Sequence, residues 1–137
     1  MNVPELIFPG IDVAKDTLEL ALDDQSKTEC IANSGKEIGA LVNRLKLLAE
    51  RIGVILLEAT GGYERPVAAA LCAAGLPVMV VNPRQARDFA KSMGYLAKTD
   101  AIDARVLSHF GRTLHQSAQR ERLLMKLPDA NQEALEA

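Results

Sequence analysis

The sequence contains few residues of several chemically informative types. Its 137 residues include two cysteines, two histidines and no tryptophan, and aromatic residues make up 4% of the chain. Cys30 and Cys72 are too few and too far apart for a zinc motif or a disulfide framework, so we expect two buried free thiols. His109 and His115 lack a ligand partner at metal-binding spacing, which favours ordinary positions on a helix surface. The composition therefore excludes zinc-finger and disulfide-scaffold proteins.

Long hydrophobic runs are also missing. The most apolar region, residues 67–81, is interrupted by Gly75 and Pro77. The start of the sequence has no basic segment followed by an apolar core, so the sequence supports neither a membrane helix nor a secretory signal. No Gly-Lys-Ser/Thr sequence follows Gly61-Gly62, which excludes a nucleotide-binding phosphate loop. We therefore expect a cytoplasmic protein that does not associate with membranes.

The net charge of −2 conceals an uneven distribution of charge. Residues 1–81 carry 11 acids and 7 lysines and arginines, whereas residues 82–126 carry 4 acids and 9 lysines and arginines. A basic segment beside a group of acids suits a DNA backbone that approaches bound cations, although a solvated helix face would have the same composition. The side chains that we expect to contact nucleic acid are Arg84, Arg87, Lys91, Lys98 and Arg105.

The first part of the chain predicts three antiparallel strands and a helix. An apolar strand ends at Asp12, and residues 17–22 alternate between apolar and polar side chains, as a half-buried strand does when it returns against its neighbour. After a turn, residues 27–32 form the third expected strand. Ser34, with a glutamate three positions later, is typical of a helix N-terminus, and apolar residues follow at helical spacing.

The second part predicts a strand, a helix and another strand in the order of a parallel pair. Residues 54–57 form a continuous apolar run, residues 67–74 a helix and residues 77–81 a further strand. Helices are then expected from Asn82 to about residue 93 and over residues 100–115. The predicted architecture is an α/β fold of the RNase H-like, RuvC-like type. It has a mixed five-stranded sheet, with three antiparallel and two parallel strands and helices on both faces.

Four acids occupy positions at which this fold would gather them. Asp12 and Glu58 end two strands, and Asp100 and Asp103 are spaced to share one face of a helix. The carboxyl ends of parallel strands meet at one edge of a sheet, and carboxylate oxygens are the ligands that Mg²⁺ prefers. We therefore predict a Mg²⁺ site for phosphodiester chemistry, with Mn²⁺ as a possible substitute. In the alternative interpretation, Asp12 and Glu58 only mark strand ends, while Asp100 as N-cap and Asp103 as the third helical residue only cap a helix.

Four motifs in this order resemble a known family. Together they are similar to the N-terminal domain of DEDD-type insertion-sequence transposases of the insertion-sequence-110 group, which are relatives of certain site-specific DNA invertases. The resemblance covers roughly residues 6–128. It implies a RuvC-like fold in which Asp12, Glu58, Asp100 and Asp103 are the catalytic acids that hold Mg²⁺. The motifs are Gly-Ile-Asp-Val-Ala-Lys-Asp at 10–16, Leu-Glu-Ala-Thr-Gly-Gly-Tyr at 57–63, Val-Asn-Pro-Arg-Gln at 81–85 and Lys-Thr-Asp-Ala-Ile-Asp-Ala-Arg at 98–105.

The resemblance also implies a domain organisation and a set of partners. Residues 1–116 would form the RuvC-like DEDD catalytic domain, and residues 117–137 a linker and the start of a helix that leads to a C-terminal domain not present in this sequence. In the family, that second domain carries a serine that attacks DNA, and a structured RNA guides target choice. We therefore expect DNA, a guide RNA and further copies of the chain as partners, and no strand exchange by this chain alone.

Three other functions stay open at this point. A stand-alone RuvC-like Holliday-junction nuclease would share the fold and nearly the length. Half of an actin-like ATPase also begins with Gly-Ile-Asp, but its following turn is rich in glycine and threonine, whereas residues 13–16 are Val-Ala-Lys-Asp. A catalytically silent fragment that binds DNA or oligomerises is the third alternative.

Overall fold

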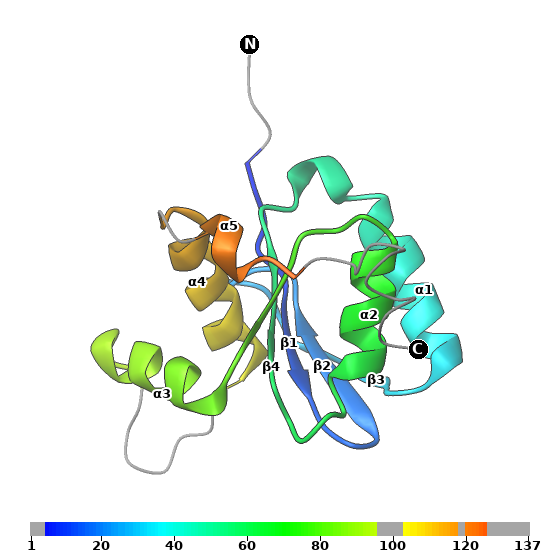
Figure 1. Ribbon diagram of the computed structural model, residues 1–137, viewed down its shortest axis with the longest axis horizontal. Coiled ribbons are helices and arrows are strands. Elements are labelled where there is room, and N and C mark those ends of the chain that lie inside the picture. The colour runs from blue at the N-terminus through cyan, green and yellow to red at the C-terminus, as the bar shows by residue number, and fades with distance from the viewer. Residues whose placement is uncertain (1–4, 96–102, 118–119, 126–137) are drawn as a thin grey trace, which may run out of the picture.

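A five-stranded mixed sheet forms the centre of the protein (Figure 1). The computed structural model describes residues 5–95, 103–117 and 120–125. The strand order is β3-β2-β1-β4-β5, in which β1, β2 and β3 are antiparallel and β4 and β5 run parallel to β1. This confirms the predicted sheet, with the strand that carries Asp12 at its centre. The strands are β1 (Gly10–Val13), β2 (Thr17–Ala21), β3 (Glu29–Ala32), β4 (Ile55–Glu58) and β5 (Val78–Val81).

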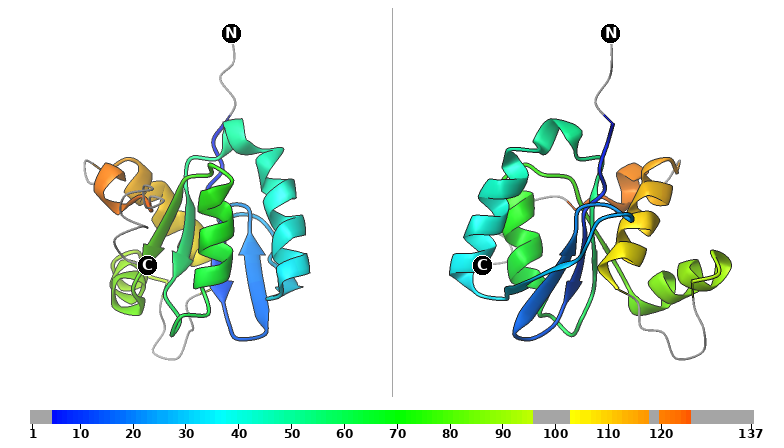
Figure 2. Two further views of the ribbon diagram at one scale, coloured as in Figure 1. Left: turned by 45° about the vertical axis from the view of Figure 1, so that its right-hand side comes forward. Right: turned by 180° about the vertical axis from the view of Figure 1, so that it is seen from behind.

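Helices cover both faces of the sheet, as Figures 1 and 2 show from three sides. Helices α1 and α2 lie on one face and pack against each other, while α4 crosses the other face over β1, β2 and β4. Helix α3 packs on α4, at the side of the molecule. The helices are α1 (Gly35–Lys46), α2 (Arg65–Ala73), α3 (Pro83–Ser92), α4 (Ala104–His115) and α5 (Arg120–Leu123), with a short 3₁₀ helix at Ala49–Arg51.

The alternation of side chains along the strands divides the core into two parts. On the face covered by α1 and α2, Ile11, Leu18 and Leu57 belong to one buried apolar cluster. On the opposite face, Leu56 and Leu107 belong to a second cluster under α4. Because successive residues of a strand point to opposite faces, the residues that follow Ile11 and Leu57 face α4. These residues are the acids Asp12 and Glu58.

The structure corrects the predicted start of the last long helix. Helix α4 begins at Ala104, and Asp103 is its N-cap because its Oδ1 accepts hydrogen bonds from the amides of Arg105 and Val106 at 2.9 and 3.1 Å. The alternative interpretation, in which Asp103 is the third residue of a helix capped by Asp100, is therefore wrong. Asp100 itself lies outside the described residues. The helix therefore begins four residues later than the predicted residue 100.

Two predictions about burial need a smaller correction. Cys72 is buried, but Cys30 is exposed, because it lies on β3 at the edge of the sheet. His115 is half-buried against the Phe8 ring, with 5.3 Å between ring centroids, and does not lie freely on a helix surface. Burial, and to a smaller degree the Arg120 guanidinium, lower the pKa of His115. Within the described residues, no helix is both long and apolar enough to cross a membrane.

Candidate active site at the carboxyl edge of the sheet

Asp12 and Glu58 are neighbours at one edge of the sheet. Gly10 pairs with Leu56 and Ile11 with Leu57 in the parallel ladder of β1 and β4, and the next step of this register brings Asp12 level with Glu58. Ile11 and Leu57 are fully buried on the face of α1 and α2, so the two acids point to the face of α4. The arrangement follows from the parallel crossover, which brings the carboxyl ends of both strands to the same edge.

The electrostatics of Asp12 reflect burial and neighbouring negative charge. The pKa of Asp12 is raised to about 6, first by burial and then by the carboxylates of Glu58, Glu19 and Asp103 in that order of importance. Burial also raises the pKa of Glu58, while the positive charge of Arg87 acts in the opposite direction. The site therefore gathers negative charge that a bound cation would stabilise.

Glu19 belongs to this acidic group, although the sequence analysis did not identify it. It pairs directly with Asp12 across the antiparallel ladder of β1 and β2. A signal was available in the sequence, because the short hairpin between the two strands limits which residues can pair. The burial of Leu18 and Leu20 on one face then places Glu19 on the other face.

Gly10 allows α4 to pass close to the strand that carries Asp12. A Cβ atom at Gly10 would collide with the carbonyl oxygen of Ala104 and would lie 2.5 Å from the amide nitrogen of Ser108. Both obstacles are backbone atoms of α4, so only glycine fits where the helix crosses the strand. This close approach brings the N-terminus of α4, and with it Asp103, toward the acids of the sheet.

Asp103 is held at the N-terminus of its helix in this structure. Its Oδ1 accepts the two amide hydrogen bonds of the cap, and its Oδ2 lies 3.3 Å from the Arg105 guanidinium. Within the described residues, no three histidine, cysteine, aspartate or glutamate side chains are arranged to ligate one metal ion. The chemistry of the donor set nevertheless fits Mg²⁺, because Asp12 and Glu58 present carboxylate oxygens with raised pKa values at one edge.

Asn33 connects the loops that follow the two acid-bearing strands. Its side-chain amide donates to the carbonyl oxygens of Ala14 at 2.9 Å and Lys15 at 3.4 Å in the β1–β2 hairpin, and to that of Tyr63 at 3.4 Å after β4. Asn33 follows β3, which runs in the same direction as β1 and so ends at the same edge of the sheet. One amide group thereby links the segments on either side of the candidate site.

Glu64 shapes the turn after Glu58. The Glu64 side chain is buried, and its Oε1 accepts hydrogen bonds from the amides of Thr60 at 2.9 Å and Gly62 at 3.1 Å. Gly61 and Gly62 have φ angles of +66° and +101°, a backbone region that other residues rarely adopt. The Gly-Gly pair thus permits the sharp turn that the sequence indicated.

The basic side chains expected to contact nucleic acid have different environments. Arg84, Arg87 and Lys91 are exposed on α3, and the charge of Arg87 reaches Glu58. Arg105 is exposed but forms an ion pair with the Asp103 carboxylate. Lys98 lies outside the described residues. Those of the predicted contact residues that the structure describes therefore lie on α3 and at the first turn of α4, beside the acids.

A cavity of about 260 Å³ lies beside Asp103. Tyr95 lines it, and its hydroxyl group contacts Nδ1 of His109. Burial raises the pKa of Tyr95, with smaller contributions from the Asp24 and Asp103 carboxylates. The cavity therefore adjoins the acidic edge and carries a phenol group at its wall. Its lining residues are Asp24, Tyr95, Asp103, Arg105 and Val106.

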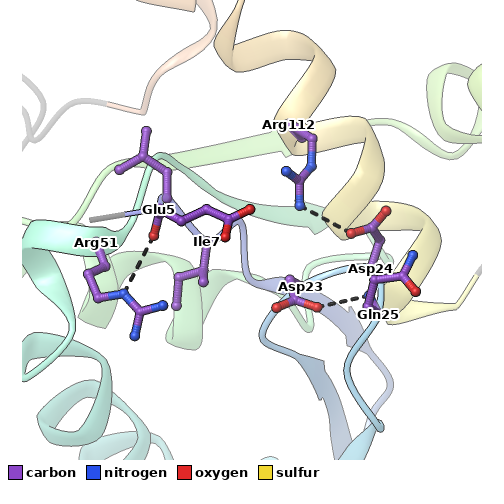
Figure 3. A pocket seen from close by; sticks show the side chains of 8 residues that line it. Glu5, Ile7, Asp23, Asp24, Gln25, Arg51 and Arg112 are labelled. Carbon is purple, nitrogen blue, oxygen red and sulfur yellow. Dashed lines mark hydrogen bonds and ion pairs between the residues drawn. The ribbon is translucent and has the colours of Figure 1, made fainter. Parts of the chain in front are cut away.

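A second cavity, of about 140 Å³, lies at the other end of the sheet (Figure 3). Glu5 and Arg51 in its lining precede β1 and β4, whereas the candidate site follows these strands. Both arginines of its lining already have protein partners: Arg112 pairs with Asp24 at 3.1 Å, and Nε of Arg51 donates to the backbone carbonyl oxygen of Glu5 at 3.5 Å. The acids at the carboxyl edge are therefore the better candidate for chemistry.

Comparisons with known proteins agree with this geometry. Pilin gene-inverting proteins of Moraxella lacunata and Moraxella bovis are each 28% identical over 108 residues, which cover 76% of this chain and 34% of the relative. This chain thus spans about a third of the length of these curated relatives. The structure of RuvC from Thermus thermophilus aligns with a TM-score of 0.52 and 19% identity, covering 89% of this chain and 100% of the RuvC chain.

The fold and the family follow from these comparisons. The structural likeness to RuvC confirms the predicted RuvC-like, RNase H-like fold. The model of the DEDD transposases of the IS110 group, described as a transposase, matches residues 9–135. Because this match covers nearly the whole chain, the protein belongs to the IS110-type DEDD transposase family.

Proposed function

We propose that this chain is the metal-dependent catalytic domain of a DNA transposase that cuts DNA strands at the ends of an insertion sequence. The observation that carries the proposal is the pair Asp12 and Glu58, which lie level with each other at the carboxyl edge of β1 and β4. Burial raises the pKa values of both, as expected for acids that a cation stabilises. The membership in a DEDD transposase family supports DNA as the substrate.

Asp12, Glu58 and Asp103 are the described residues that would hold Mg²⁺, together with Asp100 from outside the described part of the chain. When bound, Mg²⁺ would stabilise the negative charge that develops on phosphate oxygens and help to activate the nucleophile. The protein supplies a rigid sheet edge for Asp12 and Glu58, and a helix that brings Asp103 over it. Asp103 would have to turn at least one oxygen away from its present cap and ion pair.

The basic residues of α3 would hold the DNA backbone beside the acids. Arg84, Arg87 and Lys91 are exposed on one helix, and α3 starts directly after β5, at the edge where Glu58 lies. Positive side chains on such an exposed helix can neutralise DNA phosphates without contacting the bases. In this arrangement α3 orients the DNA, and the acids act on the phosphate that reaches the sheet edge.

The activity of the whole protein extends this proposal. The relatives are named for inverting a pilin gene, and they are about three times as long as the matched part. We propose that the corresponding full-length protein exchanges DNA strands, acts as a homo-oligomer and uses a structured RNA to choose its target. The matched segment would then contribute the metal-dependent step of that reaction.

Titration with Mn²⁺ tests the proposed metal site. Calorimetry would compare the unaltered chain with Asp12→Asn and Glu58→Gln, and with Glu50→Gln as a matched control. Glu50 lies on the 3₁₀ helix that precedes β4, away from the carboxyl edge. We expect Asp12→Asn and Glu58→Gln to weaken Mn²⁺ binding by tenfold or more and Glu50→Gln to leave it unchanged. Equal affinities in all four proteins would contradict the proposal.

Substrate choice separates this function from that of a stand-alone junction nuclease. Linear duplexes with insertion-sequence ends and four-way junctions would be offered in parallel, with Mg²⁺ and with chelator. A transposase domain should bind and nick the duplex ends, whereas a junction nuclease should act on the four-way junction alone. Cleavage that persists in Asp12→Asn would show that another site is responsible.

A further inference from the structure

Glu19 lies between the proposed metal site and the helix that carries Asp103. It is half-buried on β2, directly opposite Asp12, and it points to the face covered by α4. Its neighbours Leu18 and Leu20 are buried on the opposite face. A carboxylate beneath a crossing helix is unfavourable unless polar groups compensate for the lost contact with water. The structure shows which group does so.

The carboxylate of Glu19 accepts a hydrogen bond from the first amide of α4. Its Oε1 lies 3.5 Å from the nitrogen of Ala104, which is longer than the roughly 2.7–3.2 Å typical of such a bond. The next two amides, of Arg105 and Val106, donate to Oδ1 of Asp103. The amide of Leu107 donates to the backbone oxygen of Asp103 at 3.1 Å. The amides of Ala104, Arg105 and Val106, which lack a partner within the helix, therefore all have a carboxylate acceptor, and Glu19 and Asp103 share this cap.

The binding of a cation would change the hydrogen bonds of one carboxylate of the cap and leave those of the other in place. Asp103 must release part of its cap to reach an ion, which leaves amides of the first helical turn without an acceptor. Glu19 is anchored on the sheet, so its contact with Ala104 does not depend on the orientation of Asp103. The close fit of α4 over Gly10 keeps this first turn next to β1 and β2.

We propose that Glu19 is a positioning residue, which holds the first turn of α4 on the sheet so that Asp103 can turn toward the cation. This inference rests on the proposed metal site and adds a residue to it. The role requires an acceptor oxygen at position 19 rather than a negative charge. It therefore differs from the role of a ligand, which would require the carboxylate to contact the ion directly.

Three substitutions separate these roles. Glu19→Gln keeps an acceptor oxygen and removes the charge, and Glu19→Met has a similar volume but no such acceptor. Glu19→Ala removes both and guards against a packing effect of the methionine. Glu50→Ala, on the 3₁₀ helix, serves as the matched control. The readouts are the amide NMR signal of Ala104 in the metal-free protein and the affinity for Mn²⁺.

The proposal gives a distinct pattern for each variant. Glu19→Gln should keep the Ala104 signal near its original position and change the Mn²⁺ affinity by less than about threefold. Glu19→Met and Glu19→Ala should shift the Ala104 signal and weaken Mn²⁺ binding by about tenfold, as is usual when a residue that supports a metal ligand is lost. Glu50→Ala should change neither.

Two results would overturn the proposal, and a third would contradict the proposed metal site but not the contact between Glu19 and the helix. A Glu19→Gln variant that loses as much affinity as Asp12→Asn would make Glu19 a ligand. An unchanged Ala104 signal in Glu19→Met and Glu19→Ala would contradict the hydrogen bond. If the unaltered chain binds no Mn²⁺ while the Ala104 signal responds as expected, the proposed metal site is wrong and the contact between Glu19 and the helix stands.

Discussion

Asp12 destabilises the folded protein when its carboxylate is ionised and no cation is bound. Its pKa rises from 3.8 to about 6 on folding, so the folded state holds the proton more tightly than the unfolded state. The contribution of Asp12 to stability is therefore fully present below pH 3.8 and is lost as the pH rises through about 6. The shift alone corresponds to at most about 3 kcal/mol. Solvent screening of the partly exposed carboxylate reduces this to on the order of 1 kcal/mol.

We predict that Asp12→Asn stabilises the metal-free protein at pH 8 by on the order of 1 kcal/mol, or a rise in Tm of about 3 °C. The amide cannot ionise, so the unfavourable charge disappears. The gain should shrink between pH 6 and pH 4, where the aspartate becomes protonated. Thermal unfolding in chelator at several pH values measures it. A gain of the same size at pH 3.5 and pH 8 would show that ionisation of Asp12 is not the cause.

Gly10 gives a second prediction at the scale of one residue. Gly10→Ala should destabilise the protein by on the order of 3 kcal/mol, because the new Cβ meets backbone atoms of α4 that cannot rotate away. Gly39→Ala is the matched control, since its Cβ would meet nothing within 4 Å and α1 would gain helix propensity. Chemical denaturation should therefore give opposite signs for the two variants. A tolerated Gly10→Ala would contradict the close crossing of helix and strand.

At the scale of elements, the sequence predicted those structures that depend on local patterns. The alternation in residues 17–22 and the continuous apolar run at 54–57 predicted β2 and β4 to within two residues. The Asn82-Pro83 start of α3 was also correct, because the capping box is local in sequence. Such patterns depend only on neighbours in the chain. They therefore indicate the fold class and the strand order once the crossover rule is applied.

The sequence was less informative where the outcome depends on contacts between distant elements. The start of α4 was misplaced because two aspartates three positions apart offer competing caps, and local rules favour either. Glu19 was missed because its importance comes from its pairing with Asp12 and its contact with Ala104, 85 positions away. Asn33 was missed for the same reason, since its three backbone partners lie 18 to 30 positions away in two different loops. Tertiary packing decides these roles.

The Asn33 contacts give a prediction about the loops. Asn33→Ala should loosen the β1–β2 hairpin and the turn after β4 together, because one amide group holds both. We expect a loss of stability of about 1–2 kcal/mol from the lost hydrogen bonds. Hydrogen exchange of both loops should become faster, while Asn43→Ala on the exposed side of α1 changes neither loop. Faster exchange in the hairpin alone would show that the contact with Tyr63 is not important.

At the scale of the whole molecule, opposite charges lie side by side. Residues 1–81 supply Asp12, Glu19 and Glu58 to the acidic group, whereas residues 82–126 have a net charge of +5. Helix α3 carries part of this positive charge at the side of α4, away from the face of α1 and α2 (Figure 2). A DNA backbone along α3 would meet favourable charge there, and the acids would need cations before a phosphate could approach them. DNA binding and metal binding are therefore expected to support each other.

This arrangement predicts which face of the molecule binds DNA. The double variant Arg84→Glu and Arg87→Glu should weaken binding to duplexes of different sequence by the same factor, because phosphate contacts do not depend on the bases. The dependence of log Kd on log salt concentration should also become shallower by about 0.9 for each lost phosphate contact. Lys36→Glu with Lys46→Glu is the matched control, since it makes the same charge change on α1, over the opposite face of the sheet. Fluorescence anisotropy with labelled duplexes between about 50 and 200 mM salt gives both the affinity and the slope.

If the α1 variant loses as much affinity as the α3 variant, the effect comes from net charge and α3 is not the DNA-binding face. If the loss differs among sequences, the two arginines contact bases rather than the backbone.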